Sequence, residues 1–190
     1  MQHSFKYLKT EEEFTMNSKT THFGIDSVAD IARVAVIAAL YVVITTVLAA
    51  FSFGPVQVRL AEMLNLLAIY NKRYVIAVPL GVAISNLASP YGIVDIIWGS
   101  LSTFVTMLVL YYVAKHISNF YGKLVAGVLI VTFSMFTIAL ELAWLGNAAF
   151  WPTFWINWGT IAIGEFISLT IGAILLVLMS LRIDLNKLFD

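Results

Sequence analysis

The sequence contains no cysteine, and only 12% of its 190 residues are charged. The absence of cysteine excludes disulfide bonds and thiolate metal sites. The charged fraction is about half that of an ordinary soluble domain. Acidic and basic residues balance at 11 each, so net charge gives no indication of a nucleic-acid partner. With 61% hydrophobic residues and a mean hydropathy of +0.91, the chain is predicted to be an integral membrane protein forming one bundle.

Motifs for catalysis and for energy use are also missing. The sequence holds no G-x-x-x-x-G-K-[ST] motif, so this chain is not expected to hydrolyse ATP. It holds no H-E-x-x-H motif, and His3, His22 and His116 all fall in segments expected outside the membrane. A histidine metal site or a Ser-His-Asp triad inside the bundle is therefore not expected. We predict that the chain is not an enzyme and carries no metal or cofactor of its own.

The apolar residues fall into six runs that can form membrane helices. Residues 1–26 precede them, are polar and mixed in charge, and are predicted to be a flexible cytosolic tail rather than a signal peptide. Ser27 and Asp30 form a capping-box pattern at the start of the first helix. Residues 27–190 are thus predicted to be one all-α transmembrane domain, with helices at about 27–50, 56–70, 74–87, 93–114, 124–145 and 154–181.

The distribution of lysine and arginine predicts the orientation of this bundle. When the N-terminus is placed in the cytoplasm, the loops on the opposite side contain no lysine or arginine. Both termini are therefore predicted to be cytoplasmic. The basic loop and tail residues that then share the cytoplasmic side are Lys72, Arg73, Lys115, Lys123, Arg182 and Lys187.

One segment carries charge back into the membrane. The stretch 53–66 reads F-G-P-V-Q-V-R-L-A-E-M-L-N-L, and its Gly-Pro pair is a turn signal. Arg59, Glu62 and Asn65 follow at i, i+3 and i+6, forming a drifting polar stripe on one helix flank. A charge inside a bilayer costs a few kcal/mol or more, so by default it indicates function. An ion pair between Arg59 and Glu62 alone is the structural alternative.

Three further carboxylates, Asp95, Glu141 and Glu165, lie within predicted helices, and all fall in the outer half or the middle of the membrane. Polar and indole side chains share their helix faces, so these faces are predicted to converge on one outward-facing cavity. Asp95 could instead cap its helix, Asn86 could bond helices together, and the tryptophans could form an interfacial belt. The candidate substrate-binding residues are the acceptors Glu62, Asp95, Glu141 and Glu165, the donors Arg59 and Asn86, and the indoles Trp98, Trp151, Trp155 and Trp158.

The first predicted helix differs from the others. Its only polar residues within the membrane are expected to be Thr45 and Thr46, and its inner half is rich in alanine. Ala35 and Ala39 form a small-x-x-x-small pattern, which allows another helix to approach closely. This face could pack inside the bundle or dock on a partner protein.

Several of these segments together resemble a known family. They are the A-x-x-x-A face, F-G-P-V-Q-V-R-L-A-E, N-L-A-S-P-Y-G-I-V-D-I-I-W-G, and an aromatic-rich loop before the last helix. Over about residues 28–182 the chain is similar to the QueT family, substrate-binding S components of energy-coupling factor (ECF) transporters for queuosine precursors. The resemblance implies a six-helix bundle in a prokaryotic plasma membrane, with a pocket open to the outside. It also implies that Ala35 and Ala39 dock on a transmembrane coupling subunit, which carries two ATPase subunits that use ATP.

The polar set is consistent with the substrate that this resemblance implies. A deazaguanine base presents N–H donors to a carboxylate, a carbonyl to a donor such as Arg59, Asn86 or Asn157, and a flat ring to an indole. A thiamine-like cation would also suit acidic groups and indoles. Two other classes stay open: a stand-alone proton-coupled carrier with Glu141 or Glu165 as relay, and, more weakly, a membrane enzyme with an acid pair.

Overall fold

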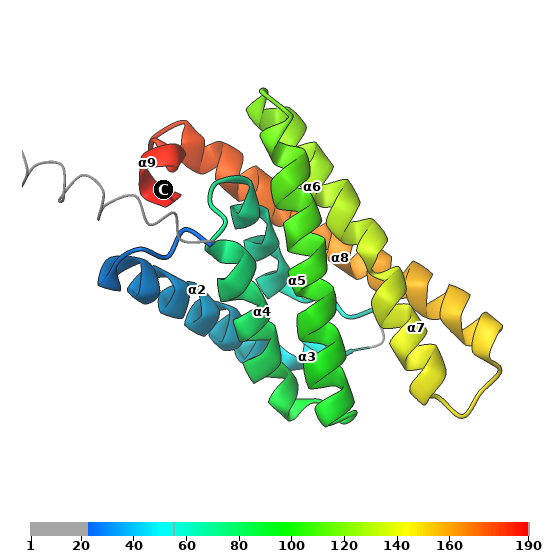
Figure 1. Ribbon diagram of the computed structural model, residues 1–190. Helices are drawn as coiled ribbons and strands as arrows, with labels where there is room; N and C mark the ends of the chain where they lie inside the picture. The colour runs from blue at the N-terminus through cyan, green and yellow to red at the C-terminus, as the bar shows by residue number, and fades with distance from the viewer. Residues whose placement is uncertain (1–22, 55, 190) are drawn as a thin grey trace, which may run out of the picture.

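The computed structural model describes residues 23–54 and 56–189, and within these ranges all regular structure is helical. The chain folds into helices that pack side by side and cross at an angle (Figure 1). In order, the helices are α2 (Val28–Val47), α3 (Ala49–Ser52), η1 (Leu60–Ile69), α4 (Tyr74–Ser85), η2 (Asn86–Ala88), α5 (Ile93–Lys115), α6 (Phe120–Ser134), α7 (Phe136–Leu145), α8 (Phe150–Ser180) and α9 (Leu185–Phe189).

Four helical stretches of the described residues are long and apolar enough to cross a membrane. The prediction of an all-helical membrane protein is confirmed at this level. The count of six spans stays a prediction, because η1 and the stretch formed by α4 and η2 are apolar but shorter. The four long spans are Val28–Val47, Ile93–Lys115, Phe120–Leu145 and Phe150–Ser180.

Helix α2 begins as the sequence predicts and packs closely on α4. Ser27 Oγ accepts a hydrogen bond from the Asp30 backbone N–H, and Asp30 Oδ2 accepts one from the Ser27 backbone N–H, which completes the capping box. A buried stripe of Val34, Ala38, Tyr41 and Thr45 runs down the helix. Tyr41 meets α4 at Gly81, where a Cβ atom would lie 2.7 Å from Tyr41 Cβ. The glycine therefore sets the close spacing of α2 and α4.

The segment that carries the polar stripe forms a 3₁₀ helix, η1, and not the α-helix over 56–70 that the sequence analysis predicts. Nearly all of η1 is buried, and it packs against α2, α4, α5, α6 and α8. A 3₁₀ helix has 3.0 residues per turn, so side chains three residues apart align instead of drifting around the axis. Glu62 and Asn65 thus lie on one edge of η1, in line with Arg59 at its N-cap.

The last two predicted helices begin earlier than expected. Helix α6 starts at Phe120, because Asn119 caps it by accepting a hydrogen bond from the Tyr121 backbone N–H. It is interrupted at Met135, where α7 takes over. Helix α8 starts at Phe150, with Pro152 in its first turn, a position where the missing N–H costs no hydrogen bond.

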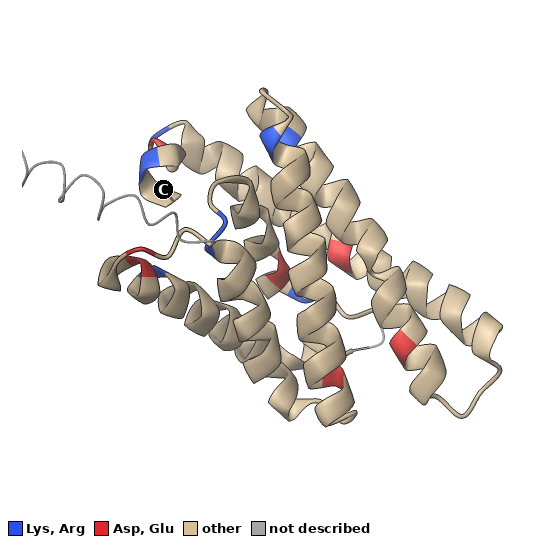
Figure 2. Ribbon diagram, viewed as in Figure 1, with Lys and Arg blue, Asp and Glu red and all other residues tan. Residues whose placement is uncertain are grey.

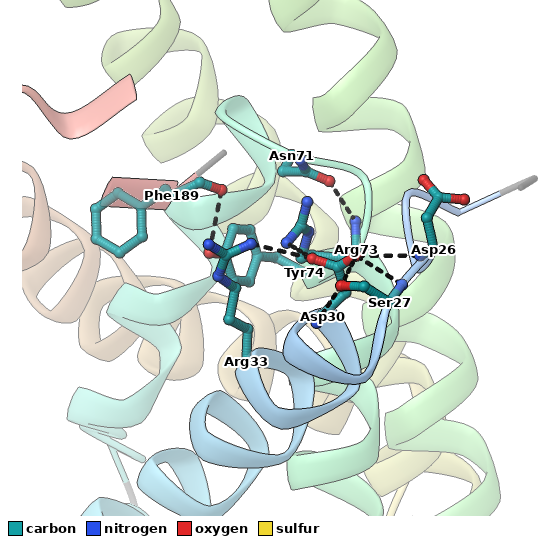
Figure 3. A network of polar contacts seen from close by, with 8 residues as sticks. All are labelled: Asp26, Ser27, Asp30, Arg33, Asn71, Arg73, Tyr74 and Phe189. Carbon is teal, nitrogen blue, oxygen red and sulfur yellow. Dashed lines mark hydrogen bonds and ion pairs between the residues drawn. The ribbon is translucent and has the colours of Figure 1, made fainter. Parts of the chain in front are cut away.

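One end of the bundle carries most of the basic residues. Figure 2 shows them gathered near α9, at the turn between α5 and α6, and at the turn before α4. At this end Asp30 pairs with Arg73 and with Arg33, and the Tyr74 hydroxyl donates to the Phe189 carbonyl (Figure 3). The start of α2 is thereby tied to the start of α4. Residues 1–22 of the predicted tail lie outside the described residues.

Candidate functional site

A cavity of about 470 Å³ lies among η1, α5, α6, α7 and α8. Its wall reaches residues 89–91, in the turn between α4 and α5, and Gly146 at the end of α7. These connections lie at the opposite end of their helices from the basic turns at Lys72 and Lys115. Five of the predicted site residues line this cavity: Arg59, Glu62, Asn86, Asp95 and Glu165.

Glu62 is the centre of a buried hydrogen-bonded group. Its Oε1 accepts from the Tyr41 hydroxyl at 2.5 Å, and its Oε2 accepts from Asn65 Nδ2 at 2.5 Å. Arg59 Nη1 lies 3.7 Å from Oε1. Buried polar groups are costly unless they are hydrogen-bonded, and here both carboxylate oxygens are satisfied by the protein itself. Glu62 therefore anchors Arg59 and Asn65 in the cavity wall.

Arg59 links this group to the turn at the far end of α4. Its Nη1 also donates to Asn86 Oδ1 at 3.4 Å, and its guanidinium carbon lies 5.2 Å from the centre of the Phe53 ring. Asn86 Nδ2 in turn donates to the backbone carbonyl of Asp95 at 3.0 Å and to its Oδ1 at 3.3 Å. Asp95 thus accepts hydrogen bonds from Asn86. It does not cap its own helix, because the N-cap of α5 is Gly92 and no side chain makes a capping hydrogen bond there. A polar chain extends from η1 to α5 along one wall.

Glu165 lines the cavity from α8 and differs from Glu62. Its side chain is buried, with 2% of the residue exposed, yet its Oε1 has no hydrogen-bond partner among the described residues. Asn65 Oδ1, in the same cavity, also has none. Two residues that line the cavity thus each have a buried acceptor without a protein partner, and the cavity can hold a ligand with N–H donors.

The other predicted site residues lie outside the lining of this cavity. The side chain of Trp98 lies against α7, where its Nε1 donates to the Thr137 carbonyl at 2.9 Å. Trp151 and Trp155 are largely exposed, and Trp158 packs on Phe154. Glu141 is buried in α7, and neither of its carboxylate oxygens has a partner among the described residues. Binding roles for these residues stay predictions that the cavity geometry does not support.

Tyr41 and Gln57 are among the site residues that the sequence-based set of candidate binding residues misses. The Tyr41 hydroxyl donates a hydrogen bond to Glu62, so the prediction that Thr45 and Thr46 are the only polar residues of the first helix within the membrane is wrong. The sequence pattern could have identified Tyr41, because Val34, Ala38 and Tyr41 lie at i, i+4 and i+7 on the buried face of α2. Gln57 lines the cavity as well. It lies two residues before Arg59, in the same motif.

The chemistry of the cavity favours binding over catalysis. Three carboxyl groups and one guanidinium surround it, together with the amides of Gln57, Asn65, Asn86 and Asn157. Among the described residues there is no group of three or more His, Asp or Glu side chains that could hold a metal ion. A mostly pre-formed cavity with a few fixed polar groups suits a small molecule with a polar, hydrogen-bonding edge.

Comparison with known proteins agrees with a transport role. A sequence model of the QueT transporter family matches residues 31–181. The queuosine precursor transporter QueT of Lactococcus lactis subsp. cremoris (strain MG1363) is 42% identical over 167 residues, which cover 83% of this chain and 96% of that protein. No solved structure matches the chain. This chain therefore belongs to the QueT family, a family of transporters and not of enzymes.

Proposed function

We propose that this chain is the substrate-binding S component of an ECF importer in a prokaryotic plasma membrane. It binds a deazaguanine precursor of queuosine from outside the cell. A transmembrane coupling subunit and two ATPase subunits then drive release into the cytoplasm. The name of the Lactococcus relative, a queuosine precursor transporter, supports the substrate class. The lack of a nucleotide-binding motif in the sequence fits a chain whose energy comes from partners.

Glu165 lines the cavity, and its buried Oε1 has no partner among the described residues; this observation carries the substrate assignment. The edge of a deazaguanine ring carries adjacent N–H donors, which a carboxylate accepts through strong charge-assisted hydrogen bonds. The ring carbonyl needs a donor, and Arg59 provides one from the same cavity. Asp95, on the opposite side of Asn86, would suit the cation of an aminomethyl substituent.

In the membrane, η1 and α4 with η2 complete a set of six helices with the four long spans. Both termini are cytoplasmic in this arrangement, because the basic end of the bundle then faces the cytoplasm (Figure 2). The cavity, whose wall reaches the opposite turns, then opens to the outside. This orientation suits a receptor that collects its substrate before meeting the ATPases.

The docking face is the outer surface of α2. Ala35 and Ala39 are exposed on it, whereas Ala38 is buried against the bundle. Small side chains four residues apart allow a partner helix to approach closely within a membrane. The coupling subunit therefore packs on Ala35 and Ala39.

Equilibrium binding tests the substrate. The purified chain in detergent is titrated by calorimetry with 7-aminomethyl-7-deazaguanine, 7-deazaguanine, guanine and thiamine. Saturable binding of a deazaguanine, at least tenfold tighter than thiamine, is expected. Preferential binding of thiamine, or binding of none of the four, would contradict the substrate assignment.

Uptake assays test the partners. Replacing both Ala35 and Ala39 with tryptophan is expected to abolish uptake in cells and to leave binding in detergent unchanged. Val125→Trp with Leu129→Trp is the matched control, because these residues have the same spacing on the exposed face of α6. Normal uptake by the alanine variant, or uptake driven by a pH gradient in vesicles that hold only this chain, would contradict docking on a coupling subunit.

A further inference from the structure

The short connection that leads into η1 contains an unusual backbone conformation. Gln57 has a φ of +48°, and within residues 23–54 and 56–189 it is the only residue other than glycine with a positive φ. Side chains with a Cβ atom are disfavoured in this left-handed region, which glycine adopts freely. The Gln57 N–H donates to the Gly54 carbonyl at 3.0 Å, so the strained residue closes a tight turn.

Helix α8 provides the surface against which this turn rests. A Cβ atom on Gly164 would lie 2.9 Å from the Gln57 carbonyl oxygen and closer still to the Val56 carbonyl oxygen. The obstacle would be backbone, which cannot swing aside as the end of a side chain can. Gly164 therefore allows the turn to lie directly on α8. The next residue in the sequence, Glu165, lines the cavity.

The Gln57 side chain has no structural task that would explain the strain. Gln57 lines the cavity, and its amide makes no hydrogen bond to other described residues. Backbone strain of this kind is stored mainly at functional sites, where the surroundings hold it in place. A glutamine in a conformation suited to glycine indicates that its amide is needed for a ligand.

We infer that Gln57 is a specificity-determining residue of the cavity and that Gly164 is the positioning residue that holds it there. The inference rests on the proposed function and adds a residue to its binding site. An amide offers both an N–H donor and a carbonyl acceptor. Together with Glu165 and Arg59, it forms hydrogen bonds that match the order of donors and acceptors along the polar edge of the ring. An adenine-type edge, in which that order is reversed, leaves these groups unpaired and is rejected.

The experiment compares 7-deazaguanine with 7-deazaadenine by calorimetry on the full chain in detergent. Gln57→Gly removes the amide and relieves the strain, so its melting temperature is expected to equal or exceed that of the unchanged protein. Its affinity for 7-deazaguanine is expected to fall about tenfold, and its preference over 7-deazaadenine is expected to fall about tenfold as well. A purely structural role would change stability and leave the preference intact.

Gly164→Ala is expected to produce the same two losses by displacing the turn. Gly159→Ala is the matched control in the same helix, because a Cβ atom there meets nothing within 4 Å. It should change affinity less than about twofold. Since both lesions act through one contact, the double variant of Gln57→Gly and Gly164→Ala should bind within about threefold of Gly164→Ala alone.

Each outcome decides a different claim. Unchanged affinity and preference in Gln57→Gly would overturn the role of Gln57, even if Gly164→Ala failed to fold. Effects of the two substitutions that multiply in the double variant would overturn the positioning role of Gly164. Failure of the unchanged protein to bind any deazaguanine would overturn the proposed function together with this inference.

Discussion

Asp30 and Glu165 are both buried carboxylates near helical packing surfaces, but their surroundings differ. Asp30 Oδ2 accepts hydrogen bonds from the Asp26 and Ser27 backbones and from Ser27 Oγ, and its Oδ1 faces Arg33 and Arg73 (Figure 3). Glu165 lines a cavity and has a buried oxygen with no partner among the described residues. The first group is saturated by the protein, whereas the second has capacity left for a ligand.

This difference separates structural from functional charge in a protein with few charges. A saturated carboxylate holds two segments together, here the starts of α2 and α4. A buried acceptor without a partner carries a desolvation cost that only a ligand, or a proton, can offset. Substitutions at the two sites should therefore affect different measurements.

The largest expected effect on binding is at Glu165. Glu165→Gln replaces a carboxyl group, which can accept hydrogen bonds at both oxygens, by an amide, whose N–H₂ would oppose the N–H donors of the ring. The loss of a charge-assisted hydrogen bond and the new mismatch should weaken deazaguanine binding about 100-fold, or about 2.7 kcal/mol. Calorimetric titration measures this directly.

The comparison predicts that the same substitution leaves stability unchanged or slightly improved, because it removes a buried carboxyl oxygen that has no hydrogen-bond partner among the described residues. The melting temperature of the ligand-free protein in detergent is the control measurement. A marked loss of stability with unchanged affinity would reverse the roles assigned to the two carboxylates.

At Asp30 the expected effect is on stability. Asp30→Asn leaves Arg73 buried beside a neutral group, and should lower the melting temperature by roughly 5–10 °C. Asp184→Asn is the control, since Asp184 and Lys187 are exposed and 3.7 Å apart and such pairs contribute little. Substrate affinity of folded Asp30→Asn should match that of the unchanged protein. Weaker binding by fully folded Asp30→Asn protein would show that the basic end of the bundle is coupled to the cavity.

Glu62 combines both kinds of role and should have an intermediate effect. Its oxygens are satisfied by Tyr41 and Asn65, so it acts on the ligand through the position of Arg59. Glu62→Gln should weaken binding about tenfold, or about 1.4 kcal/mol. Tyr41→Phe, which keeps the ring and removes one hydrogen bond, should weaken it less. Equal affinity of Glu62→Gln and the unchanged protein would exclude this indirect role.

Local signals in the sequence predict much of this fold. The capping box at Ser27 and Asp30 locates the start of α2, and the motif around Arg59 and Glu62 identifies the segment that enters the cavity. Both depend on residues close in sequence, whose spacing fixes their relation on one helix. The family assignment follows from such motifs and is confirmed by the comparisons.

Features that depend on contacts between distant segments are not predictable in this way. The 3₁₀ geometry of η1 arises where its neighbours enclose it on all sides, and no local propensity requires it. The partner of Glu62 comes from Tyr41, 21 residues earlier. The turn at Gln57 rests on Gly164, more than a hundred residues later.

The tryptophans provide the smallest expected effect and the sharpest test of the sequence-based site. Four indoles are among the candidate binding residues predicted from the sequence, yet Trp151 and Trp155 are 63% and 59% exposed and do not line the cavity. At a membrane surface such rings stabilise the position of a helix at the lipid interface. Trp155→Phe should therefore change deazaguanine affinity less than about twofold, because the ring has no ligand contact to lose. Calorimetric titration of Trp155→Phe and Glu165→Gln in parallel compares their affinities for the deazaguanine. A tenfold loss in the tryptophan variant would mean that the indoles close over the bound ligand, and that the cavity changes shape on binding.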